Sequence, residues 1–495
     1  MRILGINALN HDAAISMIDD GRVVFAGHSE RYSGIKNDPE LNRQLFRDCF
    51  QNGKPHKVAY FERPWLKKAR QLRAGQYSEV FRLSNVPVNY LRRHLGNTPI
   101  EYVQHHQSHA AAGYYTSPYE ESCIVVIDAI GEFETCTIWY AYGSHFEKRF
   151  SLKYPNSLGL WYSAMTQRIG LKPQEDEYIL MGMDAWGTRD KELKQNIYND
   201  FFETGDLPLQ MKENLHRGCM NWNPSYYPND NTEEWKFNIA ANVQWICEEE
   251  IQKVFKIAQE IVPETQNCVY MGGVALNCVA NSIIAKDYYP KLWIFPNPGD
   301  AGSSLGSAAY LFGEHVKWDS PFNGYNIKGR YPWKKALTSL LDGNIVGVAN
   351  GRAEFGPRAL GNRSLIADPR GHDIKDRVNK IKHRQEFRPF APSVLEEHAH
   401  TIFDMPVRKS QFMQFTAPCK FPDLYPAICH VDNTSRVQTV SKDDNPGYYK
   451  LINEFYKKTG CPMVLNTSLN IKGQPIVNDY IDGVEFTKKY KVEVF

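Results

Sequence analysis

Two histidines and two distant aspartates are the residues whose types and spacing best suit metal chemistry. His105 and His109 lie in the run VQHHQSHAAAGYY, and their i, i+4 spacing puts both imidazoles on one face of a helix. Asp128 ends the apolar run CIVVID, where a carboxylate in a buried strand needs a compensating partner. With Asp300, these side chains offer two nitrogen and two oxygen ligands, which suit iron, manganese or zinc. The histidine spacing alone is more typical of two structural histidines than of a metal site, and the Glu of the zinc-protease signature is absent.

Two polar turns beside strand-like runs carry further candidates. The run NHDAAIS places His11 and Asp12 near the first predicted hairpin, and ERYSGIK adds Lys36. His11 can act as a general base or can be a structural histidine bonded to its own turn. The run MGGVALNCVANS places two glycines and Asn277 between a strand and a helix, an arrangement that binds phosphate on backbone N–H groups.

Arginines are concentrated in the C-terminal third of the chain. They occur in GRAEFGPRALGNRSL, KHRQEFRPFAPS and HVDNTSRVQTV, and MVLNTSLNIKGQPIV adds hydroxyl and amide groups. Guanidinium groups combined with such donors are suited to a small phosphorylated substrate, whereas a single arginine makes a surface ion pair about as often. The candidates are Arg358, Arg363, Lys382, Arg384, Arg388, His430, Arg436, Asn466, Thr467, Ser468 and Asn470.

The composition is that of an ordinary globular protein of two or three domains. The chain has 495 residues, 42% of them hydrophobic and 23% charged, with a formal net charge of +2. No apolar run reaches the roughly 20 residues that span a bilayer, and the N-terminus lacks signal-peptide features, so we expect a cytoplasmic protein without a membrane partner. Ten cysteines occur without a C-x-x-C pair, which argues against a zinc ribbon.

The elements that must position these residues alternate between strands and helices. Strand-like runs open the chain and recur at KVAYFE, CIVVIDAIGE and CVYMGG, while residues 238–261 have helical periodicity. The Pro-, Gly- and aromatic-rich run 318–333 breaks this alternation, so we predict domains at 1–325 and 335–495. Residues 54–93 carry ten Lys or Arg against two Glu, which indicates either a solvated helical face or a surface for a phosphate-bearing acceptor, including nucleic acid.

The chain resembles the NodU/CmcH/TobZ-type O-carbamoyltransferases from Ile3 to about Val477. The runs HHQSHA, GGVALN, EFGPRALGNRS, FRPFAPS, RVQTV and LNTSLN are close to the family's own spellings. The resemblance implies an α/β protein whose N-terminal domain has the actin/hexokinase/heat-shock ATPase (ASKHA) fold. It also implies a C-terminal YrdC-like α/β domain.

The resemblance further implies a reaction and its cofactors. Carbamoyl phosphate and ATP, with Mg²⁺, would form carbamoyl adenylate in the C-terminal domain, and the carbamoyl group would then pass to an acceptor hydroxyl in the N-terminal domain. It assigns iron(2+) to His105, His109, Asp128 and Asp300. It places His11 and Lys36 around the transferred carbamoyl group, and Arg358, Arg388, Arg436, Asn466 and Ser468 around carbamoyl phosphate and the nucleotide. From their own positions we add Asp12 as catalytic, Gly272, Gly273 and Asn277 as nucleotide-binding, and Lys382 and Arg384 as carbamoyl phosphate-binding.

The acceptor is left open by the sequence. A sugar, a natural product, a glycan or a hydroxymethylated pyrimidine in a nucleotide or DNA all fit, and a homodimer is also open. The family's EYKVMGLAPYG is replaced by EYILMGMDAWG, and residues 190–237, with Trp222, Tyr226, Tyr227 and Trp235, have no counterpart. Insertions of this kind often set substrate choice, although each aromatic side chain can also be a core residue. The alternatives are a threonylcarbamoyl-type tRNA-modifying transferase and a non-catalytic nucleotide-binding relative.

Overall fold

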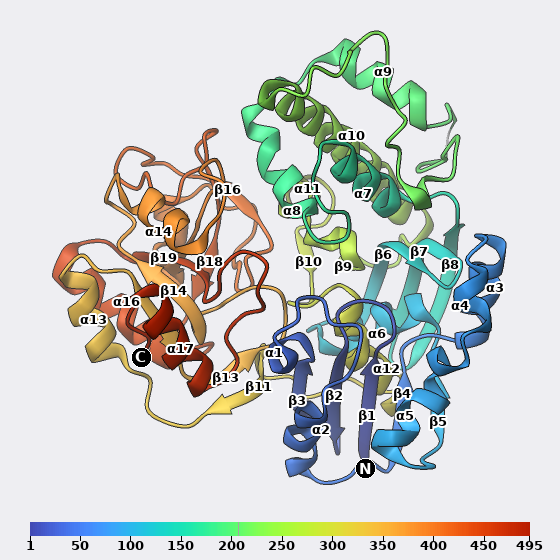
Figure 1. Cartoon of the computed structure of the whole chain (residues 1–495), viewed down its shortest axis with the longest axis horizontal. Coiled ribbons are helices and arrows are strands. Elements are labelled where there is room, and N and C mark those ends of the chain that lie inside the picture. The colour runs from blue at the N-terminus through green and yellow to red at the C-terminus, as the bar shows by residue number, and fades with distance from the viewer. Residues whose placement is uncertain (206) are drawn as a thin grey trace.

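The computed structural model describes residues 1–205 and 207–495. It is an α/β protein in which a large N-terminal part, blue to yellow in Figure 1, lies beside a smaller C-terminal part, orange to red. The α/β fold class expected from the sequence is therefore confirmed.

The first sheet has the strand order β3-β2-β1-β4-β5. Strands β1 (Arg2–Asn7), β2 (Ala14–Asp19) and β3 (Arg22–His28) are antiparallel, and β4 (Lys57–Tyr60) and β5 (Ile100–Tyr102) run parallel to β1. Five helices connect these strands: α1 (Glu30–Ser33) and α2 (Arg43–Cys49) between β3 and β4, and α3 (Pro64–Arg73), α4 (Tyr77–Phe81) and α5 (Pro87–Leu95) between β4 and β5.

The second sheet repeats this topology in the order β10-β9-β6-β7-β8. Strands β6 (Glu121–Gly131), β7 (Glu134–Tyr142) and β8 (His145–Lys153) are antiparallel, and β9 (Asn267–Met271) and β10 (Lys291–Trp293) continue parallel to β6. Two sheets with the same order and the same strand directions form the duplicated ASKHA architecture that the resemblance implied.

Two helices of small residues pack between the sheets. Helix α6 (His105–Thr116) follows the last strand of the first sheet, and α12 (Ser303–Phe312) follows the last strand of the second. Their buried alanines allow the two helices to lie close together within one hydrophobic cluster: Ala110, Ala111, Ala112, Ala308 and Ala309. The predicted helix carrying the histidine pair is confirmed, and it begins at His105 itself.

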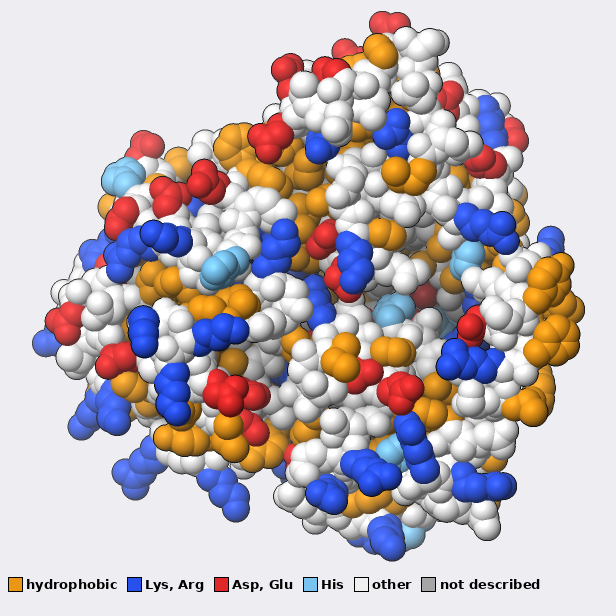
Figure 2. Space-filling view, viewed as in Figure 1, with side chains coloured by type: hydrophobic (Ala, Val, Ile, Leu, Met, Phe, Trp, Pro, Cys, Tyr) orange, Lys and Arg blue, Asp and Glu red, His pale blue; other side chains and the backbone are white. Residues whose placement is uncertain are grey.

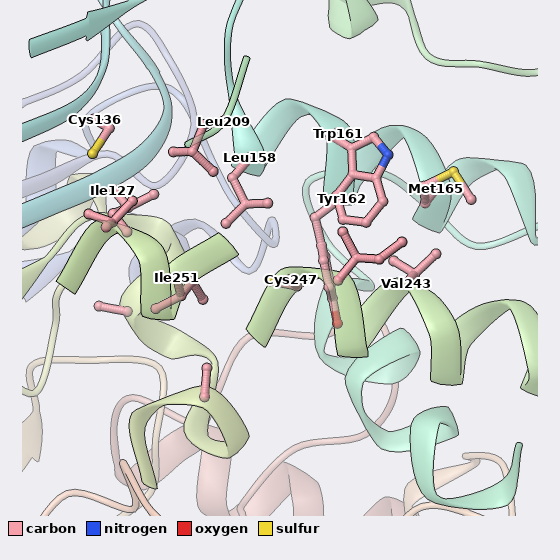
Figure 3. Packing of buried hydrophobic residues seen from close by; sticks show 14 of the residues in the cluster. Ile127, Cys136, Leu158, Trp161, Tyr162, Met165, Leu209, Val243, Cys247 and Ile251 are labelled. Atoms are coloured by element: carbon pink, nitrogen blue, oxygen red, sulfur yellow. The ribbon is translucent and has the colours of Figure 1, made fainter. Parts of the chain in front are cut away.

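The largest hydrophobic cluster lies above the second sheet in Figure 1. It is built by α7 (Leu158–Arg168), α8 (Glu177–Met183), α9 (Lys191–Phe201), α10 (Glu233–Ile261) and α11 (Cys278–Asp287). Figure 3 shows Tyr162 on α7 extending toward Val243 and Cys247 on α10, while the ring of Trp161 points the other way and packs on Phe202, with centroids 5.0 Å apart. Burying each such large side chain contributes about 1.5–3 kcal/mol, so this cluster holds the helices rigidly over the sheet.

The aromatic residues of the 190–237 insertion largely pack against this cluster. Trp235 is buried in it, and the ring of Tyr227 stacks on Trp235 with centroids 6.4 Å apart. Trp222 donates its indole N–H to Asp200, as does the hydroxyl of the half-exposed Tyr226. Of the two interpretations left open by the sequence, the core role therefore fits Trp222, Tyr227 and Trp235.

The C-terminal part is built on a mixed sheet with the order β12-β14-β19-β15-β18. Its strands are β12 (Val346–Ala349), β14 (Arg363–Ala367), β15 (Ala391–Leu395), β18 (Gln438–Val440) and β19 (Met463–Ser468), and a ribbon of β11 (Phe322–Ile327) with β13 (Gly351–Glu354) connects it to the first sheet. Its remaining elements are α13 (Trp333–Leu341), α14 (Ile374–Lys382), α15 (Glu396–Ile402), α16 (Pro446–Thr459), α17 (Tyr480–Tyr490), β16 (Thr416–Pro418) and β17 (Thr434–Arg436). Its own hydrophobic cluster spans residues 336–492. The YrdC-like assignment and the domain limits stay predictions.

Two global features bear on the sequence expectations. All ten cysteines are buried free thiols. None of the helices in the described part of the chain combines the length and the apolarity needed to cross a membrane.

Candidate functional site

The two histidines and two aspartates meet at one buried point. Their ligand atoms lie within 4.8 Å of one another. The Nε2 of His105 is 3.2 Å from Oδ2 of Asp128 and 3.4 Å from Oδ1 of Asp300, and the Nε2 of His109 is 3.3 Å from the same Asp300 oxygen. The two Nε2 atoms are only 3.1 Å apart. We call these four residues the His–Asp centre.

Each ligand side chain except His105 is oriented by a second contact. The Nδ1 of His109 lies 3.1 Å from the carbonyl oxygen of Pro298, which directs the lone pair of Nε2 toward the centre. The backbone N–H of Gly273 donates to Oδ1 of Asp128 at 3.1 Å, and the amide of Asn10 donates to Oδ2 of Asp300 at 2.8 Å. The Nε2 atoms of both histidines, Oδ2 of Asp128 and Oδ1 of Asp300 face one another, as the ligand atoms of a preorganised metal site do.

The electrostatics of the centre favour a cation. Burial disfavours a charged His105, but Asp300 and Asp128 outweigh burial and raise the pKa of this imidazole well above its ordinary value. Burial and Asp300 oppose ionisation of Asp128, yet the hydrogen bond from His105 and the charges of both histidines lower its pKa to about 2. The centre therefore attracts positive charge strongly, and its nitrogen and oxygen donors fit a divalent iron, manganese or zinc ion.

Two of the predicted catalytic residues border the centre, and the third, Lys36, lies against the Tyr178 ring. The Nε2 of His11 is 3.7 Å from Oδ2 of Asp300, and its Nδ1 is 3.0 Å from Oδ2 of Asp12. Burial opposes protonation of His11, but the bond to Asp12 and the charge of Asp300 raise its pKa to about 9. Lys36 is half-buried, and its Nζ is 5.9 Å from the centre of the Tyr178 ring.

The glycine turn positions the Asp128 carboxylate. Gly272 has a φ of 92°, and a Cβ there would lie 2.1 Å from the carbonyl oxygen of Ile127, so only glycine lets this turn approach the end of β6. The side chain of Asn277 caps α11 by accepting from Ala280 and exchanges two hydrogen bonds with Gln244. Its predicted contact with a nucleotide stays a prediction, and its amide already has protein partners.

Four arginines of the C-terminal part form a second cluster, the arginine cluster: Arg358, Arg384, Arg388 and Arg436. Burial and the charges of Arg436 and Arg388 lower the pKa of Arg358 to about 9, and burial with Arg388 and Arg436 holds the pKa of Arg384 well below its usual range. Within residues 1–205 and 207–495, no carboxylate lies within 4.0 Å of any of the four. Such a group of cations calls for an anionic ligand.

The other predicted residues of this part have internal partners. The Nζ of Lys382 contacts the backbone and side chains of Ser468 and Asn470, and the Nε of Arg384 donates to Asn379 at 2.6 Å. The amide of Asn466 donates to Ser393 and Gln438. The fully buried Arg363 donates only to backbone carbonyls, which identifies it as a structural residue.

Tyr178 on α8 connects the two candidate sites. Its ring centre is 4.7 Å from the Cζ of Arg388 and 5.9 Å from the Nζ of Lys36, so it contacts one cation from each part of the chain. On the other side, Gly273 contacts Asp128, and Cys278, five residues later, lies close enough to influence Arg358 and Arg436 electrostatically. Five residues at the rise of a 3₁₀-helix span about 10 Å. The His–Asp centre and the arginine cluster therefore lie near one interface.

Sequence reasoning missed Tyr178 and Asn10 as site residues. Asn10 immediately precedes His11 in a polar turn, which was a usable signal. Tyr178 lies in the segment EYILMGMDAWG, which departs from the family's EYKVMGLAPYG, and nothing in the sequence shows which cations its ring contacts.

The substitution Gly131→Ala should weaken metal binding without unfolding the protein. A Cβ at this position would lie 2.0 Å from Cδ2 of His105, so the imidazole must move. Displacing an oriented ligand typically costs about 10- to 100-fold in metal affinity. The measurement is titration of the metal-depleted protein with Fe²⁺ or Zn²⁺, with Gly299→Ala as control, because a Cβ there meets nothing within 4 Å. If Gly131→Ala and Gly299→Ala bind the metal ion with equal affinity, the assignment of His105 as a metal ligand is contradicted.

Comparison with known proteins also divides the chain into an N-terminal and a C-terminal part. Family models described as "Carbamoyltransferase N-terminus" and "Carbamoyltransferase C-terminus" match residues 67–309 and 337–495. Uncharacterized protein sll1178 of Synechocystis sp. is 30% identical over 96% of this chain and 92% of its own length. Nodulation protein NolO of Bradyrhizobium diazoefficiens is 30% identical over 76% of this chain and 74% of its own length. The 3'-hydroxymethylcephem-O-carbamoyltransferase of Amycolatopsis lactamdurans is 32% identical over 52% of each chain.

A duplicated ASKHA sheet with a buried His–Asp centre lies beside a C-terminal part that carries the arginine cluster. The chain belongs to the carbamoyltransferase family. This confirms the resemblance identified from its motifs, and the protein is a carbamoyltransferase.

Proposed function

We propose that this enzyme is an ATP-dependent O-carbamoyltransferase that works through carbamoyl adenylate. The C-terminal part would form the adenylate, and the N-terminal part would transfer the carbamoyl group to a hydroxyl or hydroxymethyl group of an acceptor. The observation that carries the proposal is the arginine cluster without carboxylate partners at an interface with the N-terminal part.

The arginine cluster suits the first step chemically. Carbamoyl phosphate, ATP and water would yield carbamoyl adenylate, inorganic phosphate and pyrophosphate, so several phosphate groups must be bound together. Arg358, Arg388 and Arg436 can neutralise these phosphates. Burial and the repulsion between neighbouring guanidinium groups lower the pKa values of Arg358 and Arg436, and an anionic ligand would offset that repulsion. Because carbamoyl phosphate decomposes in water, a partly enclosed cationic site also protects it.

The His–Asp centre and the first turn suit the second step. The oxygen of the acceptor hydroxyl would form a bond to the carbamoyl carbon, and the bond from that carbon to the AMP oxygen would break. A divalent ion held by His105, His109, Asp128 and Asp300 would supply Lewis-acid stabilisation of phosphate oxygens, and iron(2+) is our proposed ion. His11 is the candidate acceptor of the hydroxyl proton, a role that requires its neutral form. Positive charge at the centre would offset Asp300 and lower the pKa of His11 toward that form.

The substitution Tyr178→Ala should separate adenylate formation from carbamoyl transfer. The ring contacts both Arg388 and Lys36, so we expect its loss to admit water to the region where the two sites meet. We expect pyrophosphate release within about threefold of wild type, but fewer carbamoylated acceptors for each AMP, because escaped adenylate hydrolyses. Product and AMP are counted by chromatography, with Tyr178→Phe expected to keep coupling and Tyr226→Ala as the matched tyrosine control. An unchanged ratio in Tyr178→Ala would contradict this role.

Pyrophosphate release tests the proposed function directly. It should depend on both ATP and carbamoyl phosphate in the presence of Mg²⁺ and Fe²⁺, and candidate acceptors added one class at a time should raise turnover and gain a carbamoyl group by mass. Release that requires bicarbonate and threonine would instead indicate threonylcarbamoyl transfer. ATP bound without turnover under every condition would indicate a non-catalytic relative.

A further inference from the structure

Helices α3 to α5 present an unusual amount of exposed apolar surface. The seven residues are Trp65, Leu66, Leu72, Tyr77, Phe81, Leu83 and Val88, a third of the twenty-one large hydrophobic side chains exposed in the described residues. Phe81 is 74% exposed and Trp65 is 68% exposed. Figure 2 shows hydrophobic side chains gathered along the right edge, where Figure 1 places α3 and α4. We call these seven residues the apolar platform.

The platform is a preformed surface. Trp65 and Leu72 are seven residues apart on α3, and Tyr77 and Phe81 are four apart on α4, so each pair lies on one helix face. Between the helices, the buried Lys68 donates from Nζ to the carbonyls of Glu79, Val80 and Arg82, which fixes α4 and its following turn against α3. The exposed rings and aliphatic chains are thus held side by side on rigid elements.

Positive charge surrounds the platform. Several basic groups of residues 54–93 are used internally, since Arg63 and Lys67 pair with Glu132 and Glu62. Exposed arginines remain, namely Arg73, Arg82 and Arg92, and the exposed Arg217 donates to the carbonyl of Ala74 beside them. The carboxylate nearest to these arginines, that of Glu79, is 4.0 Å from Arg82 and also accepts a hydrogen bond from Asn85. The platform therefore combines aromatic and aliphatic side chains with a surplus of arginine.

We propose that the apolar platform docks this enzyme on an anionic lipid surface. Trp, Phe and Leu gain free energy at the boundary between headgroups and acyl chains, while arginine is attracted to anionic headgroups. A two-fold contact with a second copy would instead bring the surplus arginines against themselves. Leu66, Leu72 and Leu83 would gain nothing by stacking on nucleic-acid bases. Charge and side-chain type together therefore favour the lipid surface.

Docking through the apolar platform would fix which part of the enzyme faces the lipid surface. Helix α3 begins beside the His–Asp centre: Arg63 binds Glu132, four residues after Asp128, and Lys67 donates to the carbonyl of Leu9, next to Asn10. A membrane contact through α3 and α4 would thus hold the N-terminal part against the lipid surface. This peripheral contact differs from the sequence expectation of no membrane partner, and it requires no spanning helix.

Flotation with lipid vesicles tests the proposal on the full-length protein. Vesicles of phosphatidylcholine with phosphatidylglycerol should bind the protein, and vesicles of phosphatidylcholine alone should bind it at least about tenfold more weakly. The double variant Trp65→Ser and Phe81→Ser should lose at least about tenfold in vesicle affinity, and Arg73→Glu with Arg82→Glu should lose most of the dependence on phosphatidylglycerol. All four side chains are exposed, so thermal unfolding should be unchanged.

The matched control is Tyr480→Ser with Ile481→Ser, an equally exposed apolar pair at the start of α17. It should float as wild type does. The proposal is overturned if the wild type fails to float with anionic vesicles, or if both apolar double variants lose binding equally. It is also overturned if Trp65→Ser with Phe81→Ser floats normally but abolishes either a dimer seen by sedimentation or binding to a single-stranded oligonucleotide. None of these outcomes depends on the proposed carbamoyl chemistry.

Discussion

The variant His109→Ala should lose carbamoyl transfer by more than about 100-fold while still forming carbamoyl adenylate. His109 is fully buried, its Nε2 points at Asp300, and its Nδ1 is fixed by the carbonyl of Pro298. Removing it leaves three ligands, and loss of an oriented ligand weakens metal binding and the chemistry that depends on it. Pyrophosphate release should survive because the arginine cluster lies in the other part of the chain.

The helix itself supplies the matched control for this variant. His106 is also buried on α6, but its Nδ1 lies 2.9 Å from the hydroxyl of Thr137, away from the ligand atoms. His106→Asn keeps a polar atom near Nδ1 and should retain metal and transfer. Metal content by mass spectrometry and thermal unfolding separate loss of the ion from loss of the fold. Equal loss of transfer and adenylate formation in a folded His109→Ala would refute the division of the two steps.

The variant Arg388→Ala should abolish adenylate formation, by about 100- to 1000-fold. Removing one preorganised cation from a charge-stabilising site typically has an effect of this size. Arg388 contacts Tyr178, and its charge acts on Arg358 and Arg384, so its guanidinium lies at the centre of the arginine cluster. Pyrophosphate release dependent on carbamoyl phosphate is the measurement, and metal content should be unchanged.

Two companion variants make this prediction specific. Arg377→Ala removes an exposed arginine paired with Asp373 on the same domain and should leave the rate unchanged. Arg388→Lys keeps the charge but not the two-pronged geometry of guanidinium, so partial recovery is expected. An Arg388→Ala enzyme that forms adenylate at the wild-type rate would show that this arginine was assigned wrongly.

The His–Asp centre was the part of the site most accessible from the sequence. The i, i+4 spacing placed two histidines on one helix face, and the apolar run placed Asp128 in a buried strand. Asp300, 172 positions beyond Asp128, was a candidate by residue type and was matched to the metal ligands by the family resemblance, because no local pattern reports on contacts at that separation. The repeated sheet order likewise depends on pairings such as β6 with β9, which residue alternation cannot reveal.

In the arginine-rich segments, residue type alone does not distinguish a ligand-binding side chain from a structural one. Arg363 and Arg388 occur in similar motifs. Arg363 is buried and donates to backbone carbonyls, whereas Arg388 contacts the Tyr178 ring at the interface. Asn277 has an amide suited to a nucleotide, and Lys382 has an ammonium group suited to carbamoyl phosphate. In the fold, the amide oxygen of Asn277 accepts a helix-cap hydrogen bond from Ala280, and Lys382 donates to the carbonyl of Asn470 in a loop. Burial and partner choice decide between such roles, and both arise only in the folded chain.

The residues of the His–Asp centre come from equivalent positions in the two halves of the N-terminal part, each half being one five-stranded sheet with its helices. Asn10 follows the first strand of one half, and Asp128 lies near the end of the first strand of the other. His105 and His109 begin the closing helix of the first half, while Asp300 immediately precedes that of the second. The centre therefore takes its side chains from topologically equivalent places in the two halves. A chain with only one such half would have to pair with another copy to complete the centre. In the fused chain the two halves can differ, so that the first supplies the imidazoles and the second the carboxylates.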